Sequence, residues 1–285
     1  MTKIGYVTYA DNPADPDPDL DIAVFTTALR RAGYEVEIVD WQLPLTPNSF
    51  DALLIRSTWN YAQNLISFKS WLHEIAAQTR VINPVSVILH NLDKRYLFEL
   101  AYLGIPTIPT VLIENADQIF EKDLPSSKLV FKPVIGAGAR GAFVATGITE
   151  SVDEVQAHFH QSDLPLLVQP YLTEVESQGE IAVVCCNGEP LHAIVKKPAL
   201  TEGGHGDFAG NVELSADLLE FVERINQYQI GNLKVKDLYY SRIDVVPTSD
   251  GLKLMELELF EPTLFLNANR NSAEIFAAGI KSHLA

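Results

Sequence analysis

Residues 240–262 read YSRIDVVPTSDGLKLMELELFEP, a stretch in which charged and apolar residues alternate. Two such runs flank a Thr-Ser-Asp-Gly turn, which predicts a β-hairpin. With an odd-numbered loop centred on Asp250, Asp244 lies opposite Glu256, and Arg242 lies opposite Glu258. Because side chains alternate across a strand, these four charged groups share one face. The other face then carries apolar side chains, namely Ile243, Val245, Met255, Leu257 and Leu259.

The crowding of three acids beside one arginine suggests a role for this face. Facing carboxylates repel each other, so an ordinary surface hairpin has no reason to collect them. A hard divalent cation such as Mg²⁺ would turn the repulsion into ligation, because it binds carboxylate oxygens and shares its other positions with phosphates and water. The alternative is a solvated polar face over a buried apolar one, and the hairpin alone leaves both open.

The composition limits the class of protein. The chain has 285 residues, 47% of them hydrophobic, which is enough for two or three subdomains. Its net charge of −16 argues against a nucleic-acid partner but allows a nucleotide substrate beside local lysines. The adjacent Cys185 and Cys186 cannot build a disulfide framework, so we expect core residues in a reducing compartment. With no signal region and no apolar run of about 18 residues, we expect a cytoplasmic protein with no membrane partner.

The order of the predicted elements indicates three units. Residues 1–90 alternate strands and helices, which predicts a small Rossmann-like α/β domain with a parallel sheet and functional loops at the carboxyl ends of its strands. From residue 91 on, antiparallel strands with intervening helices predict α+β subdomains, which we divide into 91–167 and 168–285. A predicted helix over 91–103 places Lys94 in its first turn, where a helix N-terminus favours anions.

One strand of the N-terminal domain ends in the sequence RSTWNY at positions 56–61. An arginine, two hydroxyls and aromatic rings at such a strand end form a candidate carboxylate-binding loop. The alternative is a capped turn before a helix. The candidate substrate-binding residues of this loop are Arg56, Ser57, Thr58 and Tyr61.

A glycine-rich segment, GAGARG at positions 136–141, matches the pattern GxGxxG. A dinucleotide-binding fingerprint must open a helix, but the strand-like sequence AFVAT follows here. The segment therefore predicts a flap between two strands, whose backbone N–H groups can approach a phosphate. Lys132 at its base and Arg140 within it favour that prediction over a plain turn.

Further candidates follow along the chain. The proline-broken segment VQPYL at 168–172 can present backbone groups to a base, and Glu180 can accept hydrogen bonds from a ribose. Lys196 and Lys197 precede a glycine-rich loop at 201–210, which has the composition of a mobile lid. Solvated lysines and a merely mobile loop are the alternatives. No HExxH, Cys/His zinc spacing or GxSxG elbow occurs.

Taken in order, these motifs resemble an ATP-grasp ligase over nearly the whole chain. RSTWNY and ELELFEP at 256–262 resemble the branch near prokaryotic glutathione synthetase, which includes an enzyme of cycloserine biosynthesis. The resemblance implies two α+β subdomains that clasp ATP behind a small α/β domain. It also implies that a small carboxylate is activated as an acyl-phosphate and attacked by an amine, and that a homodimer forms.

The resemblance implies a role for each candidate. The predicted ATP-binding residues are Lys94, Lys132, Gly136, Gly138, Arg140, Gly141, Gln169, Tyr171, Leu172, Glu180 and either Lys196 or Lys197. The predicted ligands of two Mg²⁺ ions, which Mn²⁺ could replace, are Asp244, Glu256 and Glu258. Arg242 and Lys132 are the predicted catalytic residues, with Arg242 at the anionic intermediate. Many relatives have Glu-x-Asn where this chain has Glu256-x-Glu258, which leaves open the second bridging ligand and whether Glu261 faces substrate.

Two other functions compete with this one. A nucleotide-binding regulatory or scaffold protein would keep the fold without turnover, but the expected lysines, arginine and acids are all present. A nicotinamide-dependent oxidoreductase would need the GxGxxG motif to lie in a βα unit, and it does not.

Overall fold

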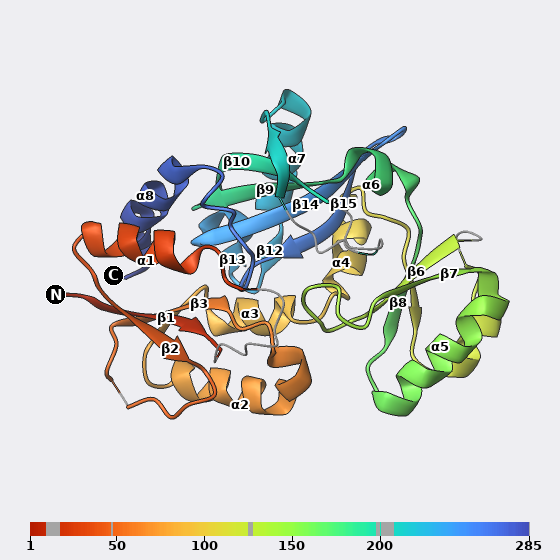
Figure 1. The fold of residues 1–285 in the computed structure, drawn as a ribbon, viewed down its shortest axis with the longest axis horizontal. Coiled ribbons are helices and arrows are strands. Elements are labelled where there is room, and N and C mark those ends of the chain that lie inside the picture. The colour runs from red at the N-terminus through yellow and green to blue at the C-terminus, as the bar shows by residue number, and fades with distance from the viewer. Residues whose placement is uncertain (10–17, 47, 125–127, 198–199, 201–207, 285) are drawn as a thin grey trace.

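The computed structural model describes residues 1–9, 18–46, 48–124, 128–197, 200 and 208–284, and its first layer is a parallel sheet. The strand order is β2-β1-β3-β4. Helix α1 (Ile22–Arg31) and helix α2 (Leu65–Ala76) flank this sheet (Figure 1). The predicted N-terminal α/β domain is therefore confirmed. Its strands are β1 (Lys3–Thr8), β2 (Glu35–Asp40), β3 (Ala52–Ser57) and β4 (Arg80–Ile82).

The second layer is a small antiparallel sheet with the order β5-β8-β6-β7. Its apolar face packs against Val155 of the amphipathic helix α5 (Gly147–Gln161). Strand β8 spans the predicted boundary between residues 167 and 168. The strands are β5 (Val111–Ile113), β6 (Lys128–Pro133), β7 (Phe143–Thr146) and β8 (Leu166–Pro170).

The third layer is an antiparallel sheet with the order β11-β10-β9-β14-β15. Cys185 and Cys186 belong to different core clusters on its two faces, as their positions in one strand predict. The strands are β9 (Glu180–Cys186), β10 (Glu189–Lys196), β11 (Phe208–Val212), β14 (Tyr240–Thr248) and β15 (Gly251–Glu258). The remaining elements are α3 (Val85–Asn91), α4 (Tyr96–Tyr102), α6 (Thr173–Gln178), α7 (Ala216–Asn226), β12 (Gln229–Ile230), β13 (Leu233–Lys234), α8 (Arg270–Gly279) and the short 3₁₀ turns at Tyr61–Asn64, Ala116–Phe120, Val235–Asp237 and Ile280–His283.

The hairpin of β14 and β15 has the predicted residue pairs, but its loop differs from the predicted one. Arg242 faces Glu258 and Asp244 faces Glu256, as predicted. The predicted odd-numbered loop is wrong, because Thr248 pairs with Gly251 and the loop between them has two residues. A β-bulge at Met255 restores the register, since an extra residue on one strand shifts the pairing by one.

The predicted helix over 91–103 is interrupted. Helix α3 ends at Asn91, and α4 begins only at Tyr96. Tertiary hydrogen bonds replace the missing turn: the Asn91 amide donates to the Leu257 carbonyl at 2.8 Å, and the Lys94 N–H donates to the Val134 carbonyl at 2.8 Å. Lys94 therefore lies in the turn between two short helices.

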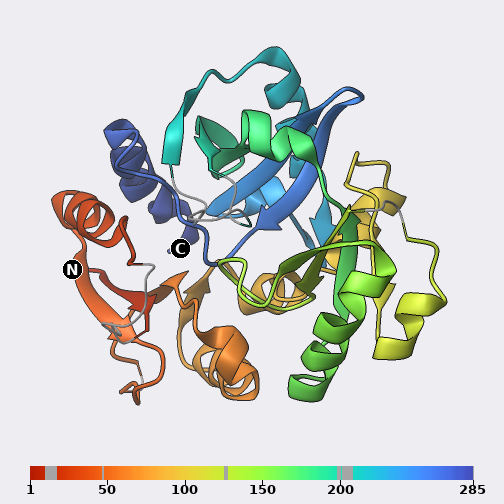
Figure 2. The same ribbon diagram turned by 45° about the vertical axis from the view of Figure 1, so that its right-hand side comes forward.

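The N-terminal domain and the C-terminal sheet share buried contacts. The Asn83 side chain is fully buried and donates to the carbonyls of Tyr240 at 2.9 Å and Leu259 at 2.7 Å. Its carbonyl accepts the Tyr239 N–H at 2.8 Å. Helix α8 lies beside α1, which brings the end of the chain back to the N-terminal domain (Figures 1 and 2). Across the described ranges, no helix is long and apolar enough to cross a membrane.

Candidate active site

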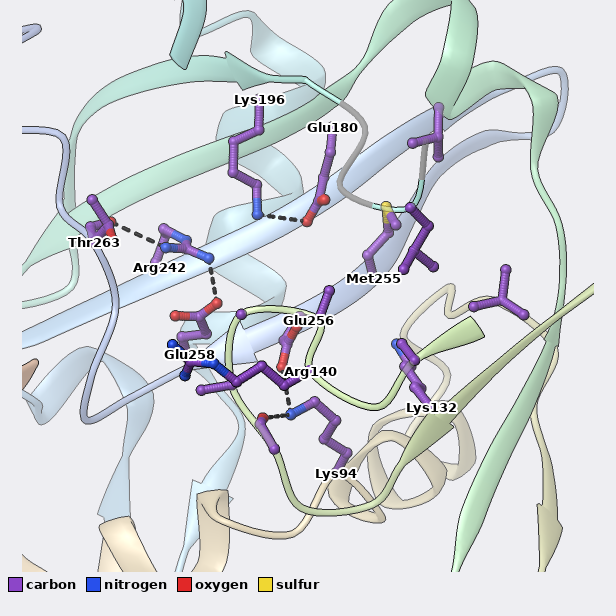
Figure 3. A pocket seen from close by; sticks show the side chains of 18 of the residues that line it. Lys94, Lys132, Arg140, Glu180, Lys196, Arg242, Met255, Glu256, Glu258 and Thr263 are labelled. Atoms are coloured by element: carbon purple, nitrogen blue, oxygen red, sulfur yellow. Dashed lines mark hydrogen bonds and ion pairs between the residues drawn. The ribbon is translucent and has the colours of Figure 1, made fainter. Parts of the chain in front are cut away.

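A cavity of about 410 Å³ is lined by the two larger antiparallel sheets and by loops of the N-terminal domain. This volume suits a small-molecule ligand, since such sites commonly enclose 300–1,000 Å³. In Figure 3, Lys196 and Glu180 lie on one side of the cavity and Lys94 and Lys132 on the other, with Glu256 between them. The cavity thus brings together groups from the glycine-rich flap, the segment at 168–172 and the hairpin of β14 and β15.

The apolar part of the cavity lies beside the end of β8. Gln169, Tyr171 and Leu172 all line it, as expected for the proline-broken segment. The Gln169 amide is held by the Thr110 hydroxyl, to which it donates at 2.9 Å. Tyr171 donates to Glu176, and its ring lies 3.5 Å from the Lys128 ammonium. These contacts hold the polar side chains of a partly apolar wall in place.

The glycine-rich flap is confirmed as a connection between the antiparallel strands β6 and β7. Gly136, Gly138 and Arg140 line the cavity, whereas Gly141 does not. The Arg140 guanidinium donates to the Trp59 carbonyl at 3.0 Å, so the flap touches the loop after β3. The flap therefore closes the cavity against the N-terminal domain.

Lys94 and Lys132 differ in their partners. The Lys94 ammonium lies 3.0 Å from a Glu256 carboxylate oxygen and donates to the Gly136 carbonyl at 2.5 Å. Within the part of the chain that the structure describes, no carboxylate pairs with Lys132. Burial lowers the pKa of the Lys132 ammonium, because a buried charge loses its hydration. An anion at this point would relieve that cost.

Lys196 and Arg242 share a buried acid. The Lys196 ammonium lies 2.6 Å from Asp244 and 2.9 Å from Glu180. The Arg242 guanidinium holds Asp244 with two bonds of 2.9 and 2.7 Å and also contacts Glu258. Burial acts against ionisation of Asp244, but the two cations hold its pKa well below the usual range. Lys197, the alternative to Lys196, is exposed and does not line the cavity.

The acids that face the cavity differ in their ionisation. Burial opposes the charge of Glu256, but the ammonium groups of Lys94 and Lys132 outweigh it and lower the pKa. Burial raises the pKa of Glu258 to about 7, although Arg242 acts in the other direction. Burial, with nearby Glu258, also raises the pKa of Glu261. Three acids in one cavity thus carry less charge than their number suggests.

The carboxylates on β15 fit a magnesium ion. No three Asp, Glu, His or Cys side chains of the described residues form a ready-made metal cluster. Mg²⁺ commonly takes one or two carboxylates and completes its shell with phosphate oxygens and water. Glu256 and Glu258 both line the cavity and supply that donor set. Asp244 is fully buried and does not line it, so it would first have to leave Arg242 and Lys196.

The predicted substrate loop is placed differently from our expectation. Arg56, Ser57 and Thr58 are buried and do not line the cavity. The Arg56 guanidinium donates to the Pro262 carbonyl at 2.6 Å and stacks 5.0 Å from the Tyr240 ring. Tyr61 is also buried outside the cavity. The loop therefore supports the cavity wall.

The residues that face the cavity from this side are Trp59 and Glu261, together with residues that the sequence did not single out. Thr263 accepts a hydrogen bond from Arg242 at 3.1 Å through its carbonyl, which no sequence pattern signals. Met255 lines the cavity because of the bulge, whereas the alternation had placed it on the apolar face. Leu20 and Phe265 complete this end. Residues 201–207 of the predicted lid lie outside the described residues.

Comparisons with known proteins agree with this arrangement. Residues 4–83 match the N-terminal domain of the D-cycloserine synthetase DcsG, and residues 97–273 match the ATP-grasp domain of prokaryotic glutathione synthetase. The cycloserine biosynthesis protein DcsG of Streptomyces lavendulae is 27% identical over 282 residues, which cover 93% of this chain and 94% of the relative. The glutathione synthetase of Ralstonia nicotianae is 25% identical over 228 residues, which cover 78% of this chain and 67% of the relative.

A solved structure shares the whole architecture. The crystal structure of D-cycloserine synthetase DcsG superposes with a TM-score of 0.87 at 24% identity and covers 99% of this chain and all of that one. The fold and the cavity define an ATP-grasp enzyme of the carboxylate–amine ligase class. The glutathione synthetase match spans more than half of the chain, so the chain belongs to the prokaryotic glutathione synthetase ATP-grasp family. This family uses ATP with Mg²⁺.

Proposed function

We propose that this protein is an ADP-forming ligase that acts on a small carboxylate and an amine. The carboxylate oxygen attacks the γ-phosphorus of ATP and ADP leaves; the amine nitrogen then attacks the acyl carbon and phosphate leaves. The observation that carries the proposal is the convergence of Lys94, Lys132, Lys196 and Arg242 with two β15 carboxylates on one cavity. Such a reaction needs mainly positioning and charge neutralisation, which this set supplies.

The residues divide by their place in the cavity. We propose that Lys94, Lys132, Lys196 and the flap bind the phosphates of ATP. The wall at 169–172 would bind its base. Glu256 and Glu258 would hold two Mg²⁺ ions, which neutralise the phosphate charge when bound. Arg242 would stabilise the oxyanion, because it lies between Glu258 and the Thr263 carbonyl and points into the cavity (Figure 3).

The end of the cavity beyond Arg242 suits a zwitterionic, amino-acid-like substrate. Arg140 and Arg242 can donate hydrogen bonds to a carboxylate, Glu261 can accept a hydrogen bond from an amine, and Trp59 and Phe265 provide apolar cover. A homodimer, a cytoplasmic location and the domain bounds 1–90, 91–167 and 168–285 complete the proposal. Light scattering behind a sizing column would measure the assembly.

The test is turnover with pooled substrates. The protein is incubated with ATP, Mg²⁺ and pools of D- and L-amino acids and small carboxylates, and ADP and phosphate are measured. Because relatives are named for D-cycloserine and glutathione, both compounds are sought among the products. We expect ADP release that depends on one pool. Nucleotide binding without turnover in any pool would favour the regulatory or scaffold alternative.

A further inference from the structure

Phe265 has a backbone conformation that is unusual for a bulky side chain. Its φ is +50°, in the left-handed region that mainly glycine and asparagine adopt. The residue lines the cavity, and its ring centroid lies 5.8 Å from the Arg242 guanidinium carbon. An aromatic residue keeps such a conformation only where its surroundings enforce it, and such residues cluster at functional sites.

A single carboxylate from the N-terminal domain binds the backbone on both sides of this residue. Asp21 accepts the N–H of Leu264 at 2.6 Å and the N–H of Leu266 at 2.8 Å, one on each side of Phe265. Asp21 is 1% exposed and does not line the cavity. It lies immediately before α1 and 3.8 Å from the Arg56 guanidinium.

The same segment also contacts strand β10 and is closed by a turn of its own. His192 on β10 contacts the Leu264 carbonyl at 3.0 Å, and the Phe265 carbonyl accepts the Ala268 N–H at 2.9 Å. The segment is thus held from two layers, and among the residues that the structure describes Asp21 is the side chain that bonds the backbone on both sides of Phe265.

We propose that Asp21 is a positioning residue that holds Phe265 as the apolar wall of the substrate end of the cavity. The ring then lies against Arg242 and narrows the space beside Glu261 and Thr263. The nucleotide end is remote from this wall, since Lys132 lies at the other end of the cavity from Thr263 (Figure 3). Loss of the Asp21 contact should therefore weaken binding of the carboxylate substrate and spare binding of nucleotide. The substrate part of this inference rests on the proposed function.

The first test is structural and needs no substrate. In Asp21→Asn, one N–H of the segment faces an amide NH₂ group in place of an oxygen, so one of the two bonds is lost. The crystal structure of this variant should show residue 265 outside the left-handed region, with its ring away from Arg242. An unchanged φ and ring position would overturn the proposal. If no pool supports turnover, the proposed function fails, and this comparison still decides the role of Asp21.

The second test is a double-mutant cycle with the substrate pair that the pools identify. Asp21→Asn should raise the KM of the carboxylate about tenfold, with kcat and the KM of ATP within about twofold. Glycine adopts the left-handed region freely, so Phe265→Gly should raise the same KM and make Asp21→Asn nearly silent in that background. Two results would show that Asp21 acts generally on the fold. One is additive effects of the two substitutions on the KM of the carboxylate. The other is that Asp21→Asn weakens binding of a non-hydrolysable ATP analogue with Mg²⁺ as much as it raises that KM.

A matched control is Asp51→Asn. Asp51 also accepts a backbone N–H of the N-terminal domain, that of Lys3 at 2.7 Å, but at the surface and away from the cavity. It should leave every kinetic constant unchanged. If Asp21→Asn does not fold, Phe265→Gly carries the test alone, and an unchanged KM for the carboxylate in that variant would reject the proposal.

Discussion

Glu256 both pairs with a lysine and faces the cavity. It lies 3.0 Å from the Lys94 ammonium and lines the cavity, where we propose that it also binds a metal ion. Its lowered pKa keeps it ionised, because Lys94 and Lys132 outweigh the effect of burial. Glu258, two residues further on, is also paired with a cation, Arg242, but there burial outweighs the pairing and raises the pKa to about 7. The two acids of β15 are therefore not equivalent.

Glu256→Gln should lower kcat about 100-fold or more, because removal of one electrostatic partner of a developing charge typically costs that much. The fold should survive, since glutamine keeps the shape of the side chain, and circular dichroism would check this. The matched control is Asp250→Asn in the turn of the same hairpin, whose side chain is 76% exposed. Near-normal turnover of Glu256→Gln would refute the metal assignment.

The flap depends on backbone that few residues can adopt. Gly141 has φ +75°, and a Cβ there would lie 3.2 Å from the Pro133 side chain. Arg140 next to it contacts the Trp59 carbonyl, so the path of the flap sets how it meets the N-terminal domain. The backbone conformation at Gly141 therefore affects how the flap closes the cavity.

Gly141→Ala should raise the KM of ATP several-fold through this change in the flap. The control is Gly104→Ala at the end of α4, where φ is +80° but nothing lies within 4 Å of an added Cβ. Both variants suffer the left-handed penalty of about 1–2 kcal/mol. Thermal unfolding should show a similar loss in both, whereas steady-state kinetics should show a change only in Gly141→Ala. An equal KM in the two variants would exclude a role for the flap in ATP binding.

Strand β10 contributes a histidine whose charge opposes folding. Burial lowers the pKa of His192 from 6.5, although its contact with Leu264 acts the other way. As pH falls below about 6.5, the unfolded chain binds the proton first, so the free energy of unfolding decreases and levels off below the folded-state pKa. Urea unfolding between about pH 5 and 7.5 should show this loss, and His192→Gln should reduce its slope. The exposed His160→Gln serves as control; an equal slope in all three proteins would contradict the assignment.

On the scale of the whole molecule, the N-terminal domain is joined to the sheet of β9–β11, β14 and β15 by buried contacts. Asn83 makes three buried hydrogen bonds to the β14–β15 region, and Arg56 lies against Tyr240 and Pro262. A rigid connection of this kind lets groups outside the cavity fix its walls. It also means that the two parts should unfold together.

Asn83→Ala should lower the free energy of unfolding by about 2–4 kcal/mol, because it leaves three buried backbone groups without partners. Asn64→Ala, which removes one long hydrogen bond near the surface, should change it by less than about 0.5 kcal/mol. Urea unfolding followed by tryptophan fluorescence would measure both. A loss in Asn83→Ala no larger than in Asn64→Ala would contradict the interdomain role.

Local patterns could predict much of this molecule. The alternation in residues 240–262 predicted a hairpin with its charged side chains on one face, and the pairing of Arg242 with Glu258 is the predicted one, although a bulge and not the assumed loop produces it. The strand after the glycine-rich segment identified a flap. The order of strands and helices then predicted the parallel sheet and the antiparallel sheets.

The errors came from tertiary contacts that no local pattern encodes. The turn at Lys94 forms because the Val134 carbonyl takes its N–H, and Met255 turns to the cavity because a bulge compensates a short loop. An arginine at a strand end is typical of ligand-binding residues, but the partners of Arg56 lie about 200 positions away, at Pro262 and Tyr240. Phe265 could not be found at all, since an aromatic residue gives no sequence signal of a left-handed backbone.

The paired charges of the cavity have a consequence for how ligands enter. Lys94 is neutralised by Glu256, and Arg242 by Glu258 and Asp244. Phosphates that bind these cations would leave the acids without their ion-pair partners. A metal ion that binds the acids would leave the cations without theirs. Each ligand alone thus meets a cost that the other removes, so nucleotide and Mg²⁺ should raise each other's affinity by the same factor. Calorimetric titration of ADP with and without Mg²⁺ should show a larger metal dependence in the native protein than in Glu256→Gln.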